Sequence, residues 1–247
     1  MPSRNLREAA FLIVRRKAAA SRTLPMLLAG FGALLGYLWI KDSFSLSLKA
    51  FMLLFPYLFL FLSQDMFRDE IDSGALENVL FVNGGFRRYL IFKIMILALV
   101  GLSAGLMALA VFAACGLGPG PARIAPGHAA QFLAGALAGL YYLAVGGYLS
   151  FFFKAGSNVL VVIIGQVVLA VGFFLSMMAR HGWVEAVLSD NLTGLLGKLR
   201  FLGIALLFPN SVVIKRDPLL IGGLALAGLG AFYLEWRKIK KLELIRR

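Results

Sequence analysis

Four carboxylates gather in one long polar segment, which runs from Phe67 to Leu90 between two strongly apolar stretches. They are four of only 12 acidic residues in the chain, and two glycines and a pair of arginines follow them. The carboxylates are Asp69, Glu70, Asp72 and Glu77, and the arginines are Arg87 and Arg88. Charged side chains grouped in this way suit recognition of another protein, so we expect this chain to meet a soluble partner here.

The remaining residues offer little other chemistry. His128 and His181 are the only histidines and Cys115 is the only cysteine, and none of them belongs to a cluster with metal-ligand spacing. The phosphate-binding pattern G-x-x-x-x-G-K-[ST] is also missing from the sequence. We therefore expect no catalytic residue, metal site or cofactor in this chain, and we do not expect it to be an enzyme by itself.

Composition indicates a membrane protein. The chain is 60% hydrophobic and 15% charged, with a mean hydropathy of +0.86. A spanning helix needs about 20 mostly apolar residues, whereas a barrel strand needs about ten that alternate with polar ones. The long continuous runs predict an all-α polytopic protein with six transmembrane helices. The predicted spans are Leu24–Ile40, Phe44–Gln64, Leu90–Gly116, His128–Phe153, Ser157–Ala179 and Leu219–Trp236.

The placement of basic residues predicts the topology. With a cytosolic N-terminus and six spans, 17 of the 25 basic residues fall on the cytosolic side, which is the positive-inside pattern. This distribution explains the net charge of +13 without nucleic acid. We expect a multi-pass protein of the inner (cytoplasmic) membrane with both termini in the cytosol. The 17 residues are Arg4, Arg7, Arg15, Arg16, Lys17, Arg22, Arg68, Arg87, Arg88, Lys93, Lys154, Arg237, Lys238, Lys240, Lys241, Arg246 and Arg247.

Three polar segments complete a single transmembrane domain covering residues 1–247. Residues 1–23 are basic with apolar residues at helical spacing, which predicts an interfacial amphipathic helix. Residues 65–89 form the cytosolic segment. Residues 182–218 would bury four charges at about 2.5–3.5 kcal/mol each if they spanned the bilayer. We therefore expect an outer amphipathic helix there, before the last span, with a short apolar piece that enters the membrane.

Aromatic residues share one face of the second predicted span, since Phe51, Phe55 and Phe59 recur every four residues. They either pack against neighbouring helices or lipid, or line a route for an apolar or lipid-linked cargo. Gly-x-x-x-Gly patterns occur in three other spans and favour close helix packing. They are Gly32/Gly36, Gly101/Gly105 and Gly135/Gly139.

The layout and the polar segment together resemble the permease subunit of a type-two ABC exporter. That family has six spans and an acidic cytosolic helix between the second and third, with a Gly-Thr-Leu-Glu motif, a basic residue and then Gly-Lys. Here Gly74, Leu76 and Glu77 match, as do Arg87 or Arg88 and Lys93. The sequence departs from the pattern at Ala75, which replaces threonine, at Asn83-Gly84-Gly85 in place of a proline turn, and at Phe92 before the lysine.

The resemblance implies a pair of permeases, either two copies or a copy and a paralogue, with two separate ATPase subunits that bind ATP and Mg²⁺. It places a coupling helix in a groove of the ATPase and implies outward transport along the interface between the permeases. The face of Phe51, Phe55 and Phe59 and the near absence of ionisable groups in the spans predict an amphipathic or lipid-like substrate rather than a small ion. Membrane lipid is the other expected partner. The coupling residues would be Glu70, Asp72, Gly74, Leu76, Glu77, Arg87 and Arg88.

Two alternatives stay open. A membrane-embedded enzyme or assembly factor without an ATPase has the same hydrophobic layout. Within the ABC class, the FRDEIDSGALENVL stretch also resembles haem-exporter-type permeases of cytochrome c maturation. The residues leave the cargo undefined among peptide, lipid, glycan, drug, haem and ion.

Overall fold

The computed structural model is helical in every regular element that it describes. Its longer elements are α3 (Phe44–Leu62), α6 (Phe86–Cys115), α7 (Pro126–Leu149), α8 (Ser157–Met178) and α12 (Pro218–Ile245); α4 (Arg68–Asp72) and α11 (Ser211–Ile214) are short. The described residues are 15, 29, 32–33, 35–37, 40, 44–72, 86–115, 126–154, 156–178, 202–214 and 217–245. The predicted interfacial helix at 1–23, except residue 15, and most of the first predicted span lie outside them.

Local sequence explains where these helices begin. Proline opens both α7 and α12, at a position where its missing N–H has no helical acceptor. Asp217 caps α12, because its Oδ1 accepts a hydrogen bond of 2.8 Å from the backbone N–H of Leu219. Gly156 precedes α8 with a φ of 77°, a left-handed conformation that glycine adopts without steric cost.

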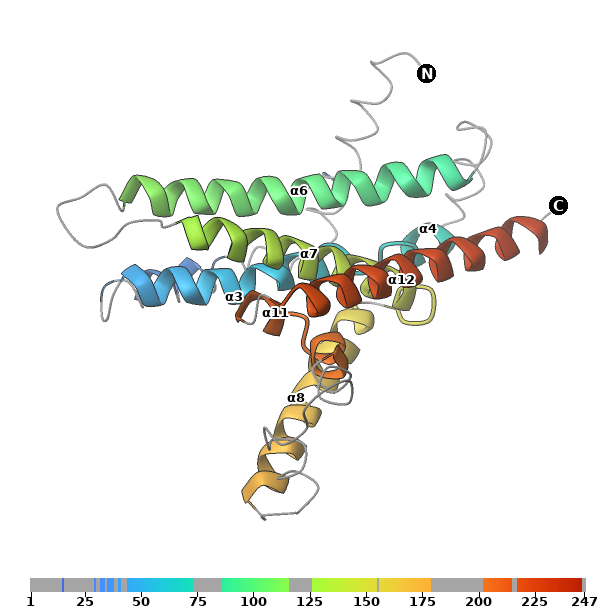
Figure 1. Ribbon diagram of the computed structural model, residues 1–247. Helices are drawn as coiled ribbons and strands as arrows, with labels where there is room; N and C mark the ends of the chain where they lie inside the picture. The colour runs from blue at the N-terminus through green and yellow to red at the C-terminus, as the bar shows by residue number, and fades with distance from the viewer. Residues whose placement is uncertain are drawn as a thin grey trace.

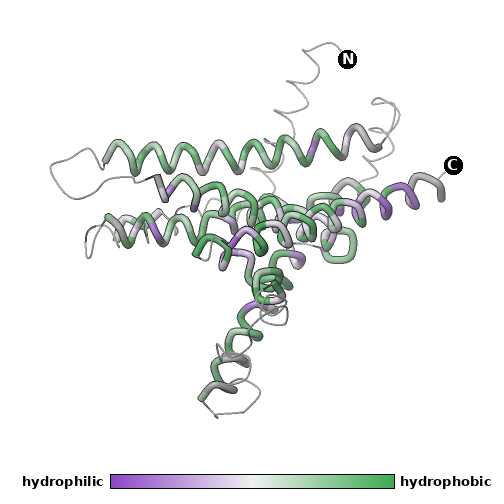
Figure 2. The backbone as a smooth tube through the Cα atoms, in the orientation of Figure 1, coloured by the Kyte–Doolittle hydropathy of each residue, from purple (hydrophilic) through white to green (hydrophobic). Residues whose placement is uncertain are grey.

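Four long helices run side by side, and α8 leaves them (Figure 1). The helix α7 packs most extensively against α3 and α12, and α6 covers the other side of α3 and α7. By contrast, α8 extends away from this group after touching α7 near its beginning. Apolar residues run along the helices, while hydrophilic residues gather toward the C-terminal end of α12 (Figure 2).

Three described helices are long and apolar enough to cross a membrane, by length and composition. They are Ile91–Ala114, Gly127–Leu149 and Pro218–Lys241, and shorter apolar stretches occupy Leu46–Leu62 and Ser157–Gly172. The described part of the chain therefore supports an all-helical membrane protein but not the full count of six spans. Large apolar side chains on the outer faces of α6 and α8 are exposed, as lipid contact requires; examples are Leu99, Met107, Val168 and Leu175.

Phenylalanine rings of α3 fill spaces that glycines leave on α6 and α7. Phe59 is completely buried, and its ring occupies the positions that side chains at Gly101 and Gly139 would need. A Cβ atom at Gly101 would lie 2.7 Å from Cε1 of Phe59. Phe55 fills the corresponding space beside Gly105. Two of the Gly-x-x-x-Gly patterns thus admit aromatic rings from α3, and the core forms at this contact.

The described part of the predicted outer segment lies against the helices. Residues 202–207 are helical, and the chain then turns through Asn210 into α11. Their carbonyl groups accept hydrogen bonds from Tyr141 of α7, at Leu206, and from Gln166 of α8, at Leu207. These hydrogen bonds connect the short apolar piece, which the sequence predicted, to both α7 and α8. The rest of the predicted outer helix lies outside the described residues.

Candidate coupling site

The C-terminal end of α3 turns sharply into α4, and this turn begins the candidate site. The backbone N–H of Ser63 donates to the carbonyl of Phe59 at 3.0 Å, and that of Met66 donates to the carbonyl of Ser63 at 3.2 Å. Asp65, between them, has a φ of 49°, in the left-handed region that aspartate tolerates better than most residues. The reversal places α4 directly beyond the end of α3.

A first set of hydrogen bonds joins this turn to the beginning of α8. Oδ1 of Asp65 accepts a bond of 2.8 Å from the N–H of Gly156. Nδ2 of Asn158, a fully buried residue, donates to the carbonyls of Ser63 at 3.0 Å and Gly146 at 2.9 Å. One side chain of α8 therefore bonds to carbonyls at the ends of both α3 and α7, which also accept from the backbone N–H groups of Met66 and Ser150, so the three helix ends are connected.

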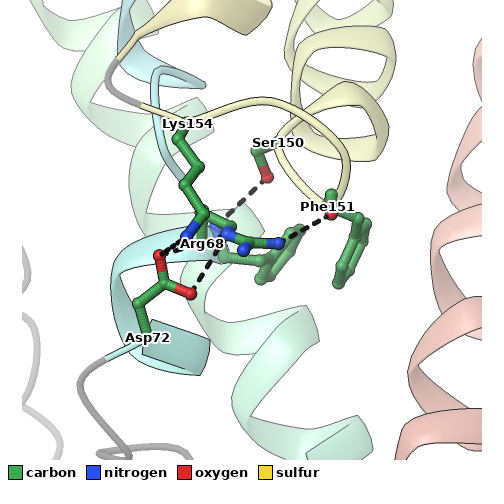
Figure 3. Close-up of polar contacts among 6 residues, drawn as sticks. Arg68, Asp72, Ser150, Phe151 and Lys154 are labelled. Carbon is green, nitrogen blue, oxygen red and sulfur yellow. Dashed lines mark hydrogen bonds and ion pairs between the residues drawn. The ribbon is translucent and has the colours of Figure 1, made fainter.

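A second set of contacts ties α4 to the loop between α7 and α8 (Figure 3). Asp72 pairs with Arg68 at 3.1 Å and with Lys154 at 3.2 Å. The guanidinium of Arg68 also donates to the carbonyl of Phe151 at 3.4 Å. Arg68 thus bridges the short helix and the loop, with Asp72 between the two cations.

Aromatic stacking lies beneath these ion pairs. The rings of Phe67 and Phe151 stack with centroids 4.8 Å apart, and both residues are buried. The backbone N–H of Phe67 donates to Oγ of Ser150 at 3.2 Å. On the other side, Lys93 of α6 donates to the carbonyl of Met66, and its ammonium lies 5.6 Å from the Phe67 ring centroid. The turn after α3 is therefore held from α6, α7 and α8 together.

We name these contacts the coupling joint. It consists of the turn and short helix 63–72, the loop and helix start 150–158, and Lys93 of α6. Its charged part faces outward, since the side chain of Lys154 is 62% exposed and that of Asp72 is 41% exposed. Its aromatic and amide part is buried. An external force on α4 would reach α3, α7 and α8 through it.

The charge of Asp72 depends on its two partners. Partial burial raises the pKa of its carboxyl, but hydrogen bonds from Lys154 and Arg68, together with their positive charges, outweigh this effect. The pKa therefore lies below the ordinary value of 3.8, and the carboxylate is ionised at neutral pH.

We expect the joint to loosen in acid. A carboxyl whose pKa is lowered on folding contributes stability above its unfolded pKa and loses that contribution as the pH falls through the folded value. Asp72→Asn should therefore melt below wild type at neutral pH, and the two curves should converge as the pH falls below 3.8. Thermal unfolding in nanodiscs at a series of pH values measures this. A melting difference that stays constant across the series would show that the charge of Asp72 contributes nothing.

The structure places the predicted coupling residues unevenly. Asp72 joins the site through both ion pairs, and Glu70 lies in α4 with its backbone alone described. Arg87 and Arg88 form part of the first turn of α6, again with only their backbone described. Gly74, Leu76 and Glu77 lie outside the described residues.

The substrate-path candidates Phe51, Phe55 and Phe59 all lie in the core of a single chain. Each is at most 2% exposed, and the Phe55 ring stacks on that of Phe132, with centroids 4.9 Å apart. In this arrangement the three phenylalanine rings pack in the interface of α3 with α6 and α7. A substrate could reach them only if those helices separated.

Sequence reasoning missed most of the polar partners in the joint. The sequence predicts Lys154 only as one of the cytosolic basic residues, and Asn158 lies within the apolar run predicted as the fifth span. A buried polar cluster farther along α8 was also missed: Gln166 accepts from the hydroxyl of Tyr57 at 2.9 Å and donates to that of Tyr142 at 2.8 Å. The available signal was the rarity of amide side chains inside apolar spans, where each needs a hydrogen-bond partner.

Within the described ranges, no group of three or more His, Cys, Asp or Glu side chains is arranged to hold a metal ion. No protein-family model, curated protein or solved structure matches this chain. Functional inference therefore depends on the residues and on their geometry.

Proposed function

We propose that this chain is the membrane-spanning permease subunit of an ABC exporter, driven by ATP that a separate ATPase subunit hydrolyses. The observation that supports this most is the coupling joint. An acidic cytosolic segment needs a mechanical connection to the spans if a partner is to move them. In this chain α4 is connected to three helix ends by ion pairs, stacked rings and buried amide bonds.

The joint suggests how such a subunit would transmit force. A partner that pushes on 68–77 would press α4 against the 150–154 loop, because Arg68 and Asp72 already contact that loop. The stacked rings of Phe67 and Phe151 resist compression, and the bonds of Asn158 keep the ends of α3 and α8 together. The expected response is a common movement of α3, α7 and α8 relative to α6.

The proposal includes six spans with both termini in the cytosol. The apolar helices α3 and α8 would supply two spans beside the three longest, and the predicted run Leu24–Ile40 would supply the first. In Figure 1, α4, the beginning of α6 and the C-terminal end of α12 lie toward one end of the bundle. The acidic segment and the basic end of α12 would then share the cytosolic face.

The proposed complex pairs this chain with a second copy or a paralogue and with two ATPase subunits, which carry the ATP and Mg²⁺. The proposed cargo is amphipathic or lipid-like. The exposed faces of α6 and α8 are apolar, with Leu106 and Phe174 among their exposed side chains, and such faces would suit the tail of a lipid-like molecule better than a hydrated ion.

Charge reversal at Glu77 tests the partner. Full-length tagged chain, purified from its native membrane in mild detergent, should bring down an ATPase subunit and its ATP hydrolysis. Glu77→Lys should lower that co-purified activity by about tenfold or more, because like-charge contacts at an interface cost at least ~1.4 kcal/mol. As a control, Asp217→Lys changes an exposed residue at the beginning of α12, the end opposite to its basic C-terminal end. This variant should leave the activity unchanged.

The two ways of failing are distinct. Wild-type chain that brings down no ATPase would refute the proposed function. An ATPase that binds wild type and Glu77→Lys equally well would keep the function but remove this segment as the docking surface.

A further inference from the structure

Glu235 is the fully buried carboxyl group among the described residues, and it lies on α12 within an apolar helix. It is 0% exposed, and neither Oε1 nor Oε2 has a hydrogen-bond partner. The carboxyl is packed against the backbone of Gly147 on α7, in the space that a side chain there would occupy. Sδ of Met66 borders the same space, 3.3 Å from that position. Glu235 is therefore enclosed by α12, α7 and the turn after α3.

The charged and titratable groups on these elements are engaged elsewhere. Lys93 of α6 donates to the carbonyl of Met66, and on the turn after α3 the carboxyl of Asp65 accepts from Gly156 while Arg68 pairs with Asp72. On α12 itself, the ammonium of Lys238 lies 4.8 Å from the centroid of the Phe152 ring. The remaining titratable or charged groups nearby in the sequence are Tyr148 of α7 and Tyr233 and Arg237 of α12, and both of these α12 residues are exposed.

An ionised carboxylate is not stable in such a place. Moving an isolated carboxylate from water into a medium of low dielectric constant costs far more than the same transfer of a neutral carboxyl, so an unpaired buried acid keeps its proton. Oε1 lies against the backbone of Gly147, in the space that a Cβ atom there would need. This buried position without a hydrogen-bond partner favours the neutral carboxyl.

We propose that Glu235 is a proton-binding site at the contact between α12 and α7. It holds one proton while α12 rests on Gly147, and it releases that proton when α12 moves away and water reaches the carboxyl. Any movement that opens this contact therefore exchanges one proton with the surrounding water. The inference does not rest on the proposed function, because it follows from burial and packing alone.

The site lies immediately behind the coupling joint, which gives the proton a structural consequence. The carbonyl of Gly147 accepts from Oγ of Ser150, and Ser150 in turn accepts from the N–H of Phe67. Met66 adjoins both Lys93 and the space beside Gly147 that Glu235 occupies. A shift of the turn 63–67 would therefore move Met66, which borders the space that the Glu235 carboxyl occupies. Proton release from Glu235 and movement of the coupling joint are linked in this way.

Infrared spectroscopy tests the protonation directly. A protonated carboxyl has a carbonyl stretching band separate from the bands of ionised carboxylates. The wild-type minus Glu235→Gln difference spectrum of full-length protein in nanodiscs at neutral pH should contain that band, shifted in D₂O. The matched control is the wild-type minus Asp217→Asn difference, which should contain carboxylate bands because Asp217 is exposed at the start of the same helix.

Unfolding gives a second measurement. Because the unfolded chain exposes an ionised Glu235, unfolding releases a proton. Above the unfolded pKa of a glutamate, about 4.3, the wild-type unfolding equilibrium constant should therefore rise with pH more steeply than that of Glu235→Gln, by up to about tenfold per pH unit. A carboxylate band at neutral pH in the Glu235→Gln difference overturns the proposal. Equal pH slopes for the two proteins overturn it as well. If Glu235→Gln does not fold, the wild-type infrared spectrum alone is measured at neutral pH in a detergent without ester groups, and the absence of a protonated-carboxyl band that shifts in D₂O overturns the proposal.

Discussion

Replacing Phe59 with alanine should destabilise the fold by about 3–5 kcal/mol, the range for removing a large aromatic side chain from a packed core. The ring is completely buried and fills the space that Gly101 and Gly139 leave open on α6 and α7. The cavity would therefore lie where three helices meet and could not close by the movement of one side chain. Unfolding by denaturing detergent in mixed micelles, followed by circular dichroism, measures the change.

The glycine side of the same contact provides a matched test. Gly139→Ala should cost about 1–3 kcal/mol, because the added methyl group meets the Phe59 ring. Gly230→Ala on α12 meets nothing within 4 Å and should be neutral or slightly stabilising, as alanine is the better helix former. In a Phe59→Leu background, Gly139→Ala should be tolerated. Equal effects of the two glycine substitutions in the wild-type background would contradict this account of the core.

This result also bears on the substrate path. If Phe59 only packs α3 against its neighbours, loss of transport in a variant should follow its loss of stability. A variant such as Phe59→Leu that keeps most of the volume should then retain transport in proportion to its folded fraction. Transport that falls while stability is kept would instead place the ring on the route of the cargo.

The helices themselves were largely predictable from the sequence. The prediction Ser157–Ala179 differs by one residue from α8 at Ser157–Met178, and Leu90–Gly116 lies almost wholly within α6 at Phe86–Cys115. Long apolar runs bounded by glycine, proline or charges specify a helix without reference to any other part of the chain. Contacts between helices depend on which faces meet, and a single sequence does not specify that.

The contact of phenylalanines with glycines shows this limit. The i, i+4 repeat of Phe51, Phe55 and Phe59 and the pairs Gly101/Gly105 and Gly135/Gly139 were each visible in the sequence. Each pattern suggested packing, yet either could have faced lipid or another subunit. Only the packing of α3 against both α6 and α7 shows that the phenylalanines of one pattern fill the space left by the glycines of the other.

Glu235 was missed for a different physical reason. It lies at the end of the predicted span Leu219–Trp236, and the basic residues that follow it in the sequence gave no sign that its own side chain would be buried. The helix continues through these basic residues, and a helix presents residues 100° apart to different surroundings. Glu235 therefore faces α7 while Arg237 and Lys240 do not share its burial. The number of charged residues in a stretch of sequence does not show which of them lies on the buried face of a helix.

Asn158→Leu should be the most damaging change in the coupling joint, with a cost of about 2 kcal/mol. The amide donates to the carbonyls of Ser63 and Gly146 and accepts from the N–H of Asp65 at 3.5 Å. Leucine has a similar volume but no polar atoms, so these hydrogen bonds would be lost, at about 0.5–1.5 kcal/mol each, while the two carbonyls would still accept from the backbone N–H groups of Met66 and Ser150. Because the change acts at the ends of α3, α7 and α8 together, we also expect faster hydrogen exchange in the turn 63–67.

Asn210→Leu is the matched comparison for this prediction. That amide donates a single hydrogen bond, 2.6 Å long, to the carbonyl of Leu53, and its own oxygen has no partner. Removing it takes away one hydrogen bond to a carbonyl within α3 and also removes one unsatisfied buried oxygen, so the net cost should be smaller than at Asn158. Both variants are measured by the same detergent unfolding, with exchange read by mass spectrometry. If the two substitutions prove equally costly, or if exchange at 63–67 stays at the wild-type rate in Asn158→Leu, then Asn158 does not hold the three helix ends together.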